Sequence, residues 1–330
     1  MQYRRMGASE FAVSEVGFGL WTVSNNLWGI RDPDEGIQLL QQAWELGVTL
    51  FDTADTYGEG IGEEILAKAL GSHRHDIIIA TKFGYDIYSP RQVNGQQEVS
   101  QNFEPAYVRY ACEQSLRRLR TDYIDLYQLH NPQISAFEQD DLFFLLEALV
   151  QEGKIRAYGT TLGPDLRGME EGCEVMPQRP IASLQIIYSI LEQLPARTFF
   201  PVASDRKIGL LARVPHASDT LTEEFKRSVQ GFVGNAAQGN LEKEWHEQEA
   251  EKLAKIDFLT QHHPLPLDQL AITFGLAESS VTTILPNITS QQQLRLYSEA
   301  SDLERPCPEC IRYLKELFDQ GLLSDSTLVT

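Results

Sequence analysis

Residues 48–57 read Val48-Thr49-Leu50-Phe51-Asp52-Thr53-Ala54-Asp55-Thr56-Tyr57, and their pattern is the strongest fold signal in the chain. An apolar run ends in a carboxylate, and a tyrosine follows five residues later. Short runs of aliphatic and aromatic residues with helical stretches between them are typical of parallel strands that are buried on both faces. The stretch therefore predicts a buried strand that ends at Asp52, with Tyr57 in the loop that follows.

Two further apolar runs end in the same way. Residues 77–81 (IIIAT) stop at Lys82, and residues 123–129 (YIDLYQL) stop at His130. In folds built from parallel strands and helices, catalytic groups collect at the carboxyl ends of the strands. We therefore expect Asp52, Tyr57, Lys82 and His130 to lie at one rim.

The strand signal alternates with helix signals along the chain. With Val16–Gly19 as the first, eight strands and the helices between them predict an α/β fold, a (β/α)8 TIM barrel closed by right-handed crossovers. The later strand predictions are Ile155–Thr160, Ser183–Ile187, Gly209–Arg213 and Val281–Leu285. The predicted helices include one opened by Asp32-Pro33 and ended at Gly47, and others over Gly62–Leu70, Glu104–Arg118 and Leu142–Gln151.

The ends of the chain extend this plan. Tyr3–Ser14 predicts an N-terminal β-hairpin, and a late helix begins after Pro306. We find no linker composition, so residues 1–330 are expected to form a single domain. Two connections, 83–102 and 214–245, are longer than ~15 residues, and loops of that length in compact domains are usually functional or mobile. Both leave strand ends at the same rim, so we expect them to lie above the site. Their aromatic residues Phe83, Tyr85 and Tyr88, with Trp21 and Trp28, either wall an apolar pocket or pack the loops down.

Charge and cysteine content exclude several classes of function. A net charge of −19 argues against binding nucleic acid or anionic membrane, and no apolar run approaches the ~20 residues that span a bilayer. Four scattered cysteines and the lack of a signal-type segment predict a cytoplasmic protein. Cys307-Pro308-Glu309-Cys310 is an isolated CxxC. Zinc would need two more ligands and a thioredoxin-like motif a preceding strand, so a structural role is favoured and no metal is expected.

The four polar residues suit the reduction of a carbonyl group. A tyrosine hydroxyl, with an ordinary pKa of ~10, is a weak acid, but an ammonium nearby favours its ionised form. A buried lysine keeps its charge only beside a carboxylate, a role open to Asp52. Tyr57 would then be the acid, activated by Lys82, and His130 would orient the carbonyl oxygen. None of these residues can supply a hydride, so a nicotinamide cofactor is expected.

The stretches FDTADTYGEG, IIIATKFG, DYIDLYQLHNP and EGKIRAYG resemble the signatures of the aldo-keto reductase superfamily, in order and in spacing. The resemblance runs from about Val16 to Tyr297. It implies a barrel of the predicted type that reduces carbonyls with NADPH. It also implies that Asp52, Tyr57, Lys82 and His130 are the catalytic tetrad.

The positions that the resemblance assigns to the cofactor match less well. Thr161-Leu162 replaces a family Ser-Asn pair, Gln185 matches an amide partner, and Arg213 stands where an aromatic residue often stacks on nicotinamide. The family position that binds the 2′-phosphate corresponds here to Thr289, which carries no charge. Both NADP(H) and NAD(H) are therefore candidates for the cofactor. His216 faces either the pyrophosphate or solvent. The expected cofactor contacts are Trp21, Thr161, Gln185, Arg213, His216, Asn287 and Gln293.

Three interpretations follow from these residues. The first is an NAD(P)H-dependent oxidoreductase that interconverts an aldehyde or ketone and its alcohol, with a small carbonyl compound or alcohol as the partner. The second is a binding module that senses nucleotide, as in the channel-associated barrel subunits that resemble this family. The third is a remnant that has lost its cofactor. The intact tetrad favours the first, and the altered positions near the adenine favour the other two.

Overall fold

The eight apolar runs form the eight parallel strands of one sheet. The computed structural model describes residues 1–24, 29–89, 91–93, 96–163, 178–232 and 240–323. The sheet order is β12-β11-β10-β9-β8-β5-β4-β3, and each neighbouring pair is parallel. The strand bounds are β3 Phe18–Gly19, β4 Leu50–Asp52, β5 Ile78–Phe83, β8 Ile124–His130, β9 Ile155–Thr161, β10 Ser183–Ile187, β11 Gly209–Arg213 and β12 Val281–Leu285.

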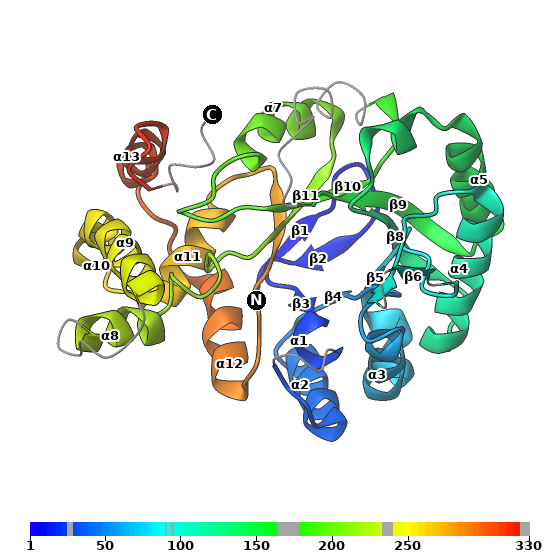
Figure 1. Cartoon of the computed structure of the whole chain (residues 1–330), viewed down its shortest axis with the longest axis horizontal. Coiled ribbons are helices and arrows are strands. Elements are labelled where there is room, and N and C mark those ends of the chain that lie inside the picture. The colour runs from blue at the N-terminus through cyan, green and yellow to red at the C-terminus, as the bar shows by residue number, and fades with distance from the viewer. Residues whose placement is uncertain (25–28, 90, 94–95, 164–177, 233–239, 324–330) are drawn as a thin grey trace.

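The first strand is shorter than predicted, and a single bridge beside it brings the sheet to near closure. Val16 lies outside β3 and forms a parallel bridge to Ile284 of β12. Gly17 N donates to Ile284 O at 2.9 Å, and Ile284 N donates to Glu15 O at 2.8 Å. The result is a nearly closed barrel, which confirms the predicted fold class (Figure 1).

Helices surround the strands, as the alternation of apolar runs predicted (Figure 1). Asp32 caps the first long helix by accepting from Asp34 N, and Gly47, with φ of 88°, follows its end. The helices are α1 Trp21–Ser24, α2 Pro33–Glu45, α3 Ile61–Leu70, α4 Pro105–Leu119, α5 Asp140–Gln151, α7 Ala196–Arg206, α8 Glu223–Phe232, α9 Asn240–Ile256, α10 Phe258–His262, α11 Leu267–Leu276, α12 Gln291–Glu299 and α13 Pro308–Asp319, with 3-10 turns at Gly71–Asp76, Ile134–Glu138 and Ala300–Asp302.

The two long connections contain regular structure that the sequence did not indicate. The first carries a small hairpin, β6 (Arg91–Val93) and β7 (Gln96–Glu98), and the second carries α8 and the start of α9. The aromatic residues of the first divide between the two roles left open. Phe83 is buried and stacks on Tyr127, and Tyr88 accepts a hydrogen bond from Arg118, so both pack the chain down. Tyr85 alone of these three contacts the ring of His130. Trp28 lies outside the described residues.

The predicted N-terminal hairpin covers the amino end of the barrel. It consists of β1 (Tyr3–Arg5) and β2 (Ala12–Ser14) and lies across the ring of strands in Figure 1. Its apolar residues pack on the inward-facing residues of five strands and fill this end of the barrel. The cluster comprises Met6, Phe11, Val13, Leu50, Ala80, Leu126, Leu211 and Leu285.

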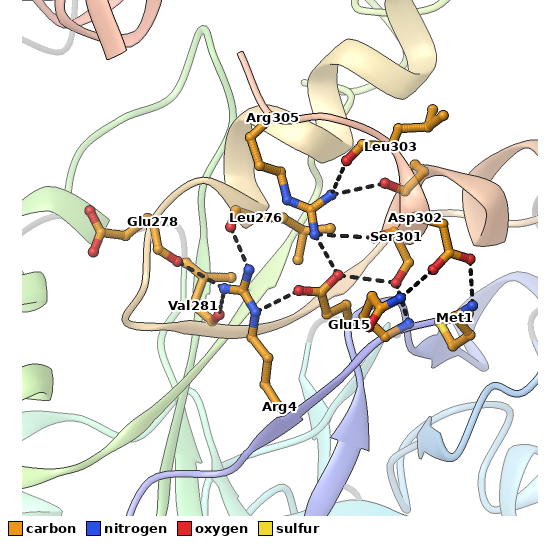
Figure 2. Close-up of polar contacts among 12 residues, drawn as sticks. Met1, Arg4, Glu15, Leu276, Glu278, Val281, Ser301, Asp302, Leu303 and Arg305 are labelled. Carbon is orange, nitrogen blue, oxygen red and sulfur yellow. Dashed lines mark hydrogen bonds and ion pairs between the residues drawn. The ribbon is translucent and has the colours of Figure 1, made fainter. Parts of the chain in front are cut away.

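A buried carboxylate joins the hairpin to the segment before α13 (Figure 2). Glu15, 4% exposed, accepts from Arg4 Nε at 2.7 Å and from Arg305 Nη2 at 2.6 Å. Ser301 Oγ donates to the same carboxylate at 3.0 Å. The Arg4 guanidinium also donates to the main-chain oxygens of Leu276, Glu278 and Val281, which lie around the amino end of β12. Because both cations face one anion, the network fastens the two ends of the described chain to each other.

Candidate active site

The four polar residues meet at the carboxyl end of the barrel. Lys82 is fully buried at the penultimate position of β5, and its Nζ donates to Asp52 Oδ1 at 2.5 Å, to Thr53 O at 2.9 Å and to Tyr57 Oη at 3.3 Å. An ammonium has three protons, so these contacts use all of them. Since Lys82 donates to the Tyr57 oxygen, the phenolic proton of Tyr57 is available to a group on its other side.

The charge of Lys82 is maintained by its neighbours. Burial by itself lowers the pKa of this lysine, but Asp52 and Tyr57 together more than offset that effect, and the pKa is raised above its usual value. The carboxylate is held in turn, because Gln128 Nε2 and Gln185 Nε2 donate to Asp52 Oδ2 at 3.0 and 2.9 Å. Lys82 is therefore a cation, although no part of it reaches solvent.

His130 stands across from Tyr57 as a neutral ring. The two ring centroids are 6.1 Å apart, and Tyr85 packs edge-on to the histidine at 5.1 Å. Burial, with the positive charges of Lys82 and Arg213, lowers the pKa of His130 to about 3. Its Nδ1 is buried and has no hydrogen-bond partner among the described residues. A neutral imidazole carries one N–H donor and does not compete with Tyr57 as an acid at neutral pH.

A cavity of about 370 Å³ opens beside these residues. Asp52, Tyr57 and Trp21 form one wall, and Trp21 packs against the Tyr57 ring with centroids 5.0 Å apart. The rest of the lining is Gly19, Gln185, Arg213, Val214, Ser218, Leu285, Pro286 and Asn287. The cavity therefore connects the tyrosine with the end of β12, where the sequence predicted the cofactor.

Several of the predicted cofactor residues fit a bound ligand. Thr161 is 2% exposed, and its Oγ1 has no hydrogen-bond partner within the described ranges. Arg213 donates from Nη2 to Leu162 O at 3.1 Å, whereas its buried Nε is unpaired among those residues. Buried polar atoms are nearly always paired in proteins, so these atoms indicate a site that takes a polar partner. Burial lowers the pKa of Arg213.

Three other candidates make contacts that the sequence did not predict. Gln185 lines the cavity, and its amide nitrogen donates to Asp52, so this group also holds the carboxylate. His216 is buried, pairs with Asp268 O at 3.2 Å and packs against Tyr297. Gln293 Oε1 accepts from Thr289 N and Oγ1 at 2.9 and 2.8 Å, which stabilises the turn into α12. The contacts of His216 arise from tertiary packing, and those of Gln293 from local capping.

The sequence reasoning missed two features. Gln128, which holds Asp52, lies two residues before His130, and residues at that spacing in a strand face the same side. The second is backbone strain beside the cavity. Val214, Ala217, Ser218 and Asp219 all have positive φ, between 47° and 73°, which non-glycine residues seldom adopt. Such strain concentrates at functional sites, and no sequence pattern announced it.

Comparison with known proteins identifies the family. The model of the Aldo/keto reductase family matches residues 15–322. The chain belongs to this family. The reductase is 30% identical, over 98% of both chains, to an uncharacterised oxidoreductase of Bacillus subtilis. It is 28% identical to the NADH-specific methylglyoxal reductase of Escherichia coli, over 88% of this chain and 90% of the relative.

Solved structures agree with this assignment. An aldo-keto reductase of Bacillus halodurans in its holo form has 29% identity and a TM-score of 0.75, with 96% of each chain covered. The glycerol dehydrogenase of Gluconobacter oxydans, at 23% identity and a TM-score of 0.77 over 99% of both chains, shares the fold. The reductase is thus an NAD(P)H-dependent oxidoreductase for small-molecule carbonyl compounds, which confirms the first of the three interpretations.

None of the helices in the described ranges has the length and apolar content needed to cross a bilayer.

Proposed function

We propose that Tyr57 is the general acid of this reductase and that Asp52, Lys82 and His130 prepare it. The observation that carries the proposal is the use of all three Lys82 protons on Asp52, Thr53 and Tyr57. The Lys82 ammonium cannot turn away from Tyr57 without breaking these buried hydrogen bonds. A positive charge therefore stays beside the oxygen on which negative charge develops.

The proton moves from Tyr57 to the substrate oxygen. The nicotinamide cofactor supplies a hydride when it is bound. The Tyr57 O–H, which faces away from Lys82, donates to the oxygen of the carbonyl group, and the phenolate that results lies against the ammonium. His130, which is neutral and packs edge-on to the Tyr57 ring, donates one hydrogen bond to the same oxygen and fixes its position. In the direction of alcohol oxidation the phenolate takes the proton back.

The cofactor would occupy the cavity between Tyr57 and the end of β12. We propose that Thr161 Oγ1 and the unpaired Nε of Arg213 bind its polar groups, with Trp21 and Asn287 on the walls. His216 would act indirectly, by fixing the strained segment 214–219 to α11. Gln293 would also position Thr289, whose main-chain N and hydroxyl donate to its amide oxygen.

Cofactor choice is proposed to be permissive. Thr289 carries no charge, and its hydroxyl is already engaged with Gln293. The relative from Escherichia coli is named as NADH-specific, which supports the use of NADH here. A cytoplasmic location and the absence of a nucleic-acid partner remain predictions from sequence and charge.

The test of the acid is Tyr57→Phe. General acid catalysis is worth ~10²–10⁴-fold, so we expect turnover of an aromatic aldehyde to fall by ~10²-fold or more. Binding of NADPH or NADH, followed by the quenching of tryptophan fluorescence, should stay near that of the unmodified protein, because the substitution removes one oxygen at the cavity wall. Unchanged turnover with normal cofactor binding would exclude Tyr57 as the acid.

A further inference from the structure

A disulfide stands at the start of α13, far from the catalytic cavity. It joins Cys307 and Cys310, whose Cα atoms are 5.0 Å apart. Cys307 is the N-cap residue of α13, and its sulfur accepts from Cys310 N at 3.0 Å. Donors at a helix N-terminus favour the thiolate form of a cysteine. The sequence favoured a structural role for this motif, whereas its surroundings in the structure indicate a role in thiol chemistry.

The disulfide contributes little to holding α13 in place. A crosslink stabilises a fold more when it closes a longer loop, and this one spans a sequence separation of three. The helix is fixed by other contacts. Leu314 is fully buried, Gln193 Nε2 donates to Leu314 O at 3.2 Å, and Arg197 pairs with Asp319 at 2.7 Å. The pair of sulfurs is therefore available for chemistry.

His263 supplies a base to the inner sulfur. Its Nε2 accepts from Cys307 N at 3.2 Å, so this nitrogen presents a lone pair, and it lies 3.7 Å from Cys310 Sγ. The ring comes from the segment between α10 and α11, 47 residues before Cys310. A thiol at position 310 would thus have a proton acceptor at hand.

Access to the pair is asymmetric. Cys310 is 5% exposed, whereas the half-buried Cys307 lines a cavity of about 710 Å³ with Arg4, Arg305, Leu276 and Ile311. Ala277 and Ser279, which also line it, lie before β12, at the amino end of the barrel. The lining has no residue in common with the catalytic cavity. Thiol–disulfide exchange needs one sulfur that can be attacked and a second that resolves the mixed disulfide, and the two cysteines meet these conditions.

We propose that Cys307 and Cys310 form a reversible thiol–disulfide exchange site for low-molecular-weight disulfides. In the reduced protein the Cys307 thiolate attacks one sulfur of RSSR, forms a Cys307–SR mixed disulfide and releases RS⁻. Cys310 gives its proton to His263 Nε2, and its thiolate attacks Cys307 Sγ. The intramolecular disulfide forms, the second RS⁻ leaves, and the protons end on the released thiols. The protein loses two electrons and RSSR becomes two RSH.

A metal site is the competing use of the same groups. His263, Cys307 and Cys310 offer three ligand atoms within 4.8 Å of one another, but zinc in structural sites takes four protein ligands. Exchange therefore accounts for the contacts better, and the experiment distinguishes the two.

The test follows the redox state of the full chain. The reduced protein is equilibrated in buffers of glutathione and glutathione disulfide, alkylated, and analysed by peptide mass spectrometry. We expect Cys307 and Cys310 to lose alkylation together over one two-electron transition. Cys310→Ser should trap a stable glutathione adduct on Cys307, and Cys307→Ser should abolish the transition. The matched control Cys112→Ser removes a buried cysteine of α4 and should leave the transition unchanged.

His263→Gln tests the base. It should slow closure of the mixed disulfide by ~10-fold or more without changing the first attack, since general base catalysis is worth at least that much. If Cys307 and Cys310 are alkylated independently of each other at every ratio of glutathione to glutathione disulfide, the proposal is overturned. So would stoichiometric zinc in the reduced protein, lost in Cys307→Ser. Melting curves of each variant identify any that fails to fold, and the trapped adduct of Cys310→Ser then decides the question alone.

Discussion

Replacement of Lys82 by methionine tests the buried ion pair that the proposed chemistry depends on. Lys82 is fully buried, Asp52 is 3% exposed, and their charged atoms are 2.5 Å apart. Lys82→Met fills a similar volume but leaves the carboxylate, within the described part of the chain, with the two amide donors of Gln128 and Gln185. Removal of one partner of a buried pair destabilises a protein by ~3–5 kcal/mol, so we expect a loss of free energy of unfolding in that range.

A double-mutant cycle separates the loss of charge from the loss of packing. Free energies of unfolding are measured by urea denaturation for Lys82→Met, Asp52→Asn and the double variant. The double variant holds no unpaired charge at this site, so we expect it to be more stable than the sum of the single effects by ~1–3 kcal/mol. Tyr57→Phe is the matched control, because it removes only the weakest Lys82 contact. Additive single effects, or a Lys82→Met variant that unfolds at the normal urea concentration, would refute the reasoning.

Three further predictions concern the cofactor, the histidine and the network at the amino end. We expect dissociation constants for NADPH and NADH within about tenfold of each other, and Thr289→Arg to shift the ratio toward NADPH in fluorescence titrations. Because the folded pKa of His130 is about 3 against an ordinary 6.5, the unfolded state binds more protons between these values and stability falls as pH falls through that window. From pH 7 to pH 5, the free energy of unfolding of His130→Gln should therefore fall by ~2 kcal/mol less than that of the unmodified protein. Equal losses in the two proteins would contradict the lowered pKa of His130. Glu15→Gln weakens two charge-assisted contacts, so we expect the free energy of unfolding in urea denaturation to fall by ~2–4 kcal/mol. An unchanged urea midpoint would contradict this prediction.

The ends of several strands were predictable from the apolar runs of the sequence. The bounds of β10, β11 and β12 equal the predicted ranges, since each apolar run stops at a change of residue type. The predicted length of the first strand was wrong. The strand β3 pairs with β4, whereas Val16 lies outside it and bridges to Ile284, more than 260 residues away. Where a strand stops in a closing barrel depends on such distant partners. The single-domain prediction remains a prediction.

The site was predictable as a group of residues and less so as a set of side-chain directions. The rule for strand ends placed Asp52, Tyr57, Lys82 and His130 together. It could not tell that the amide of Gln185 would turn to the Asp52 carboxylate, or that His216 would be buried against Tyr297. Arg118 shows the same limit. Its guanidinium pairs with the buried Glu63, 55 residues earlier in the chain, at 2.6 Å. Local pattern carries no information on such distant partners.

The network around Glu15 has a consequence for the order in which the chain folds. Glu15 leaves the ribosome some 290 residues before Arg305 and Ser301. Until then, of the two arginines that pair with this carboxylate, Arg4 alone has been synthesised. Contacts of such sequence separation slow folding, because the intervening loop must be closed first. The amino end of the barrel is therefore expected to remain open during most of synthesis and to close in a late step, after translation of the segment before α13.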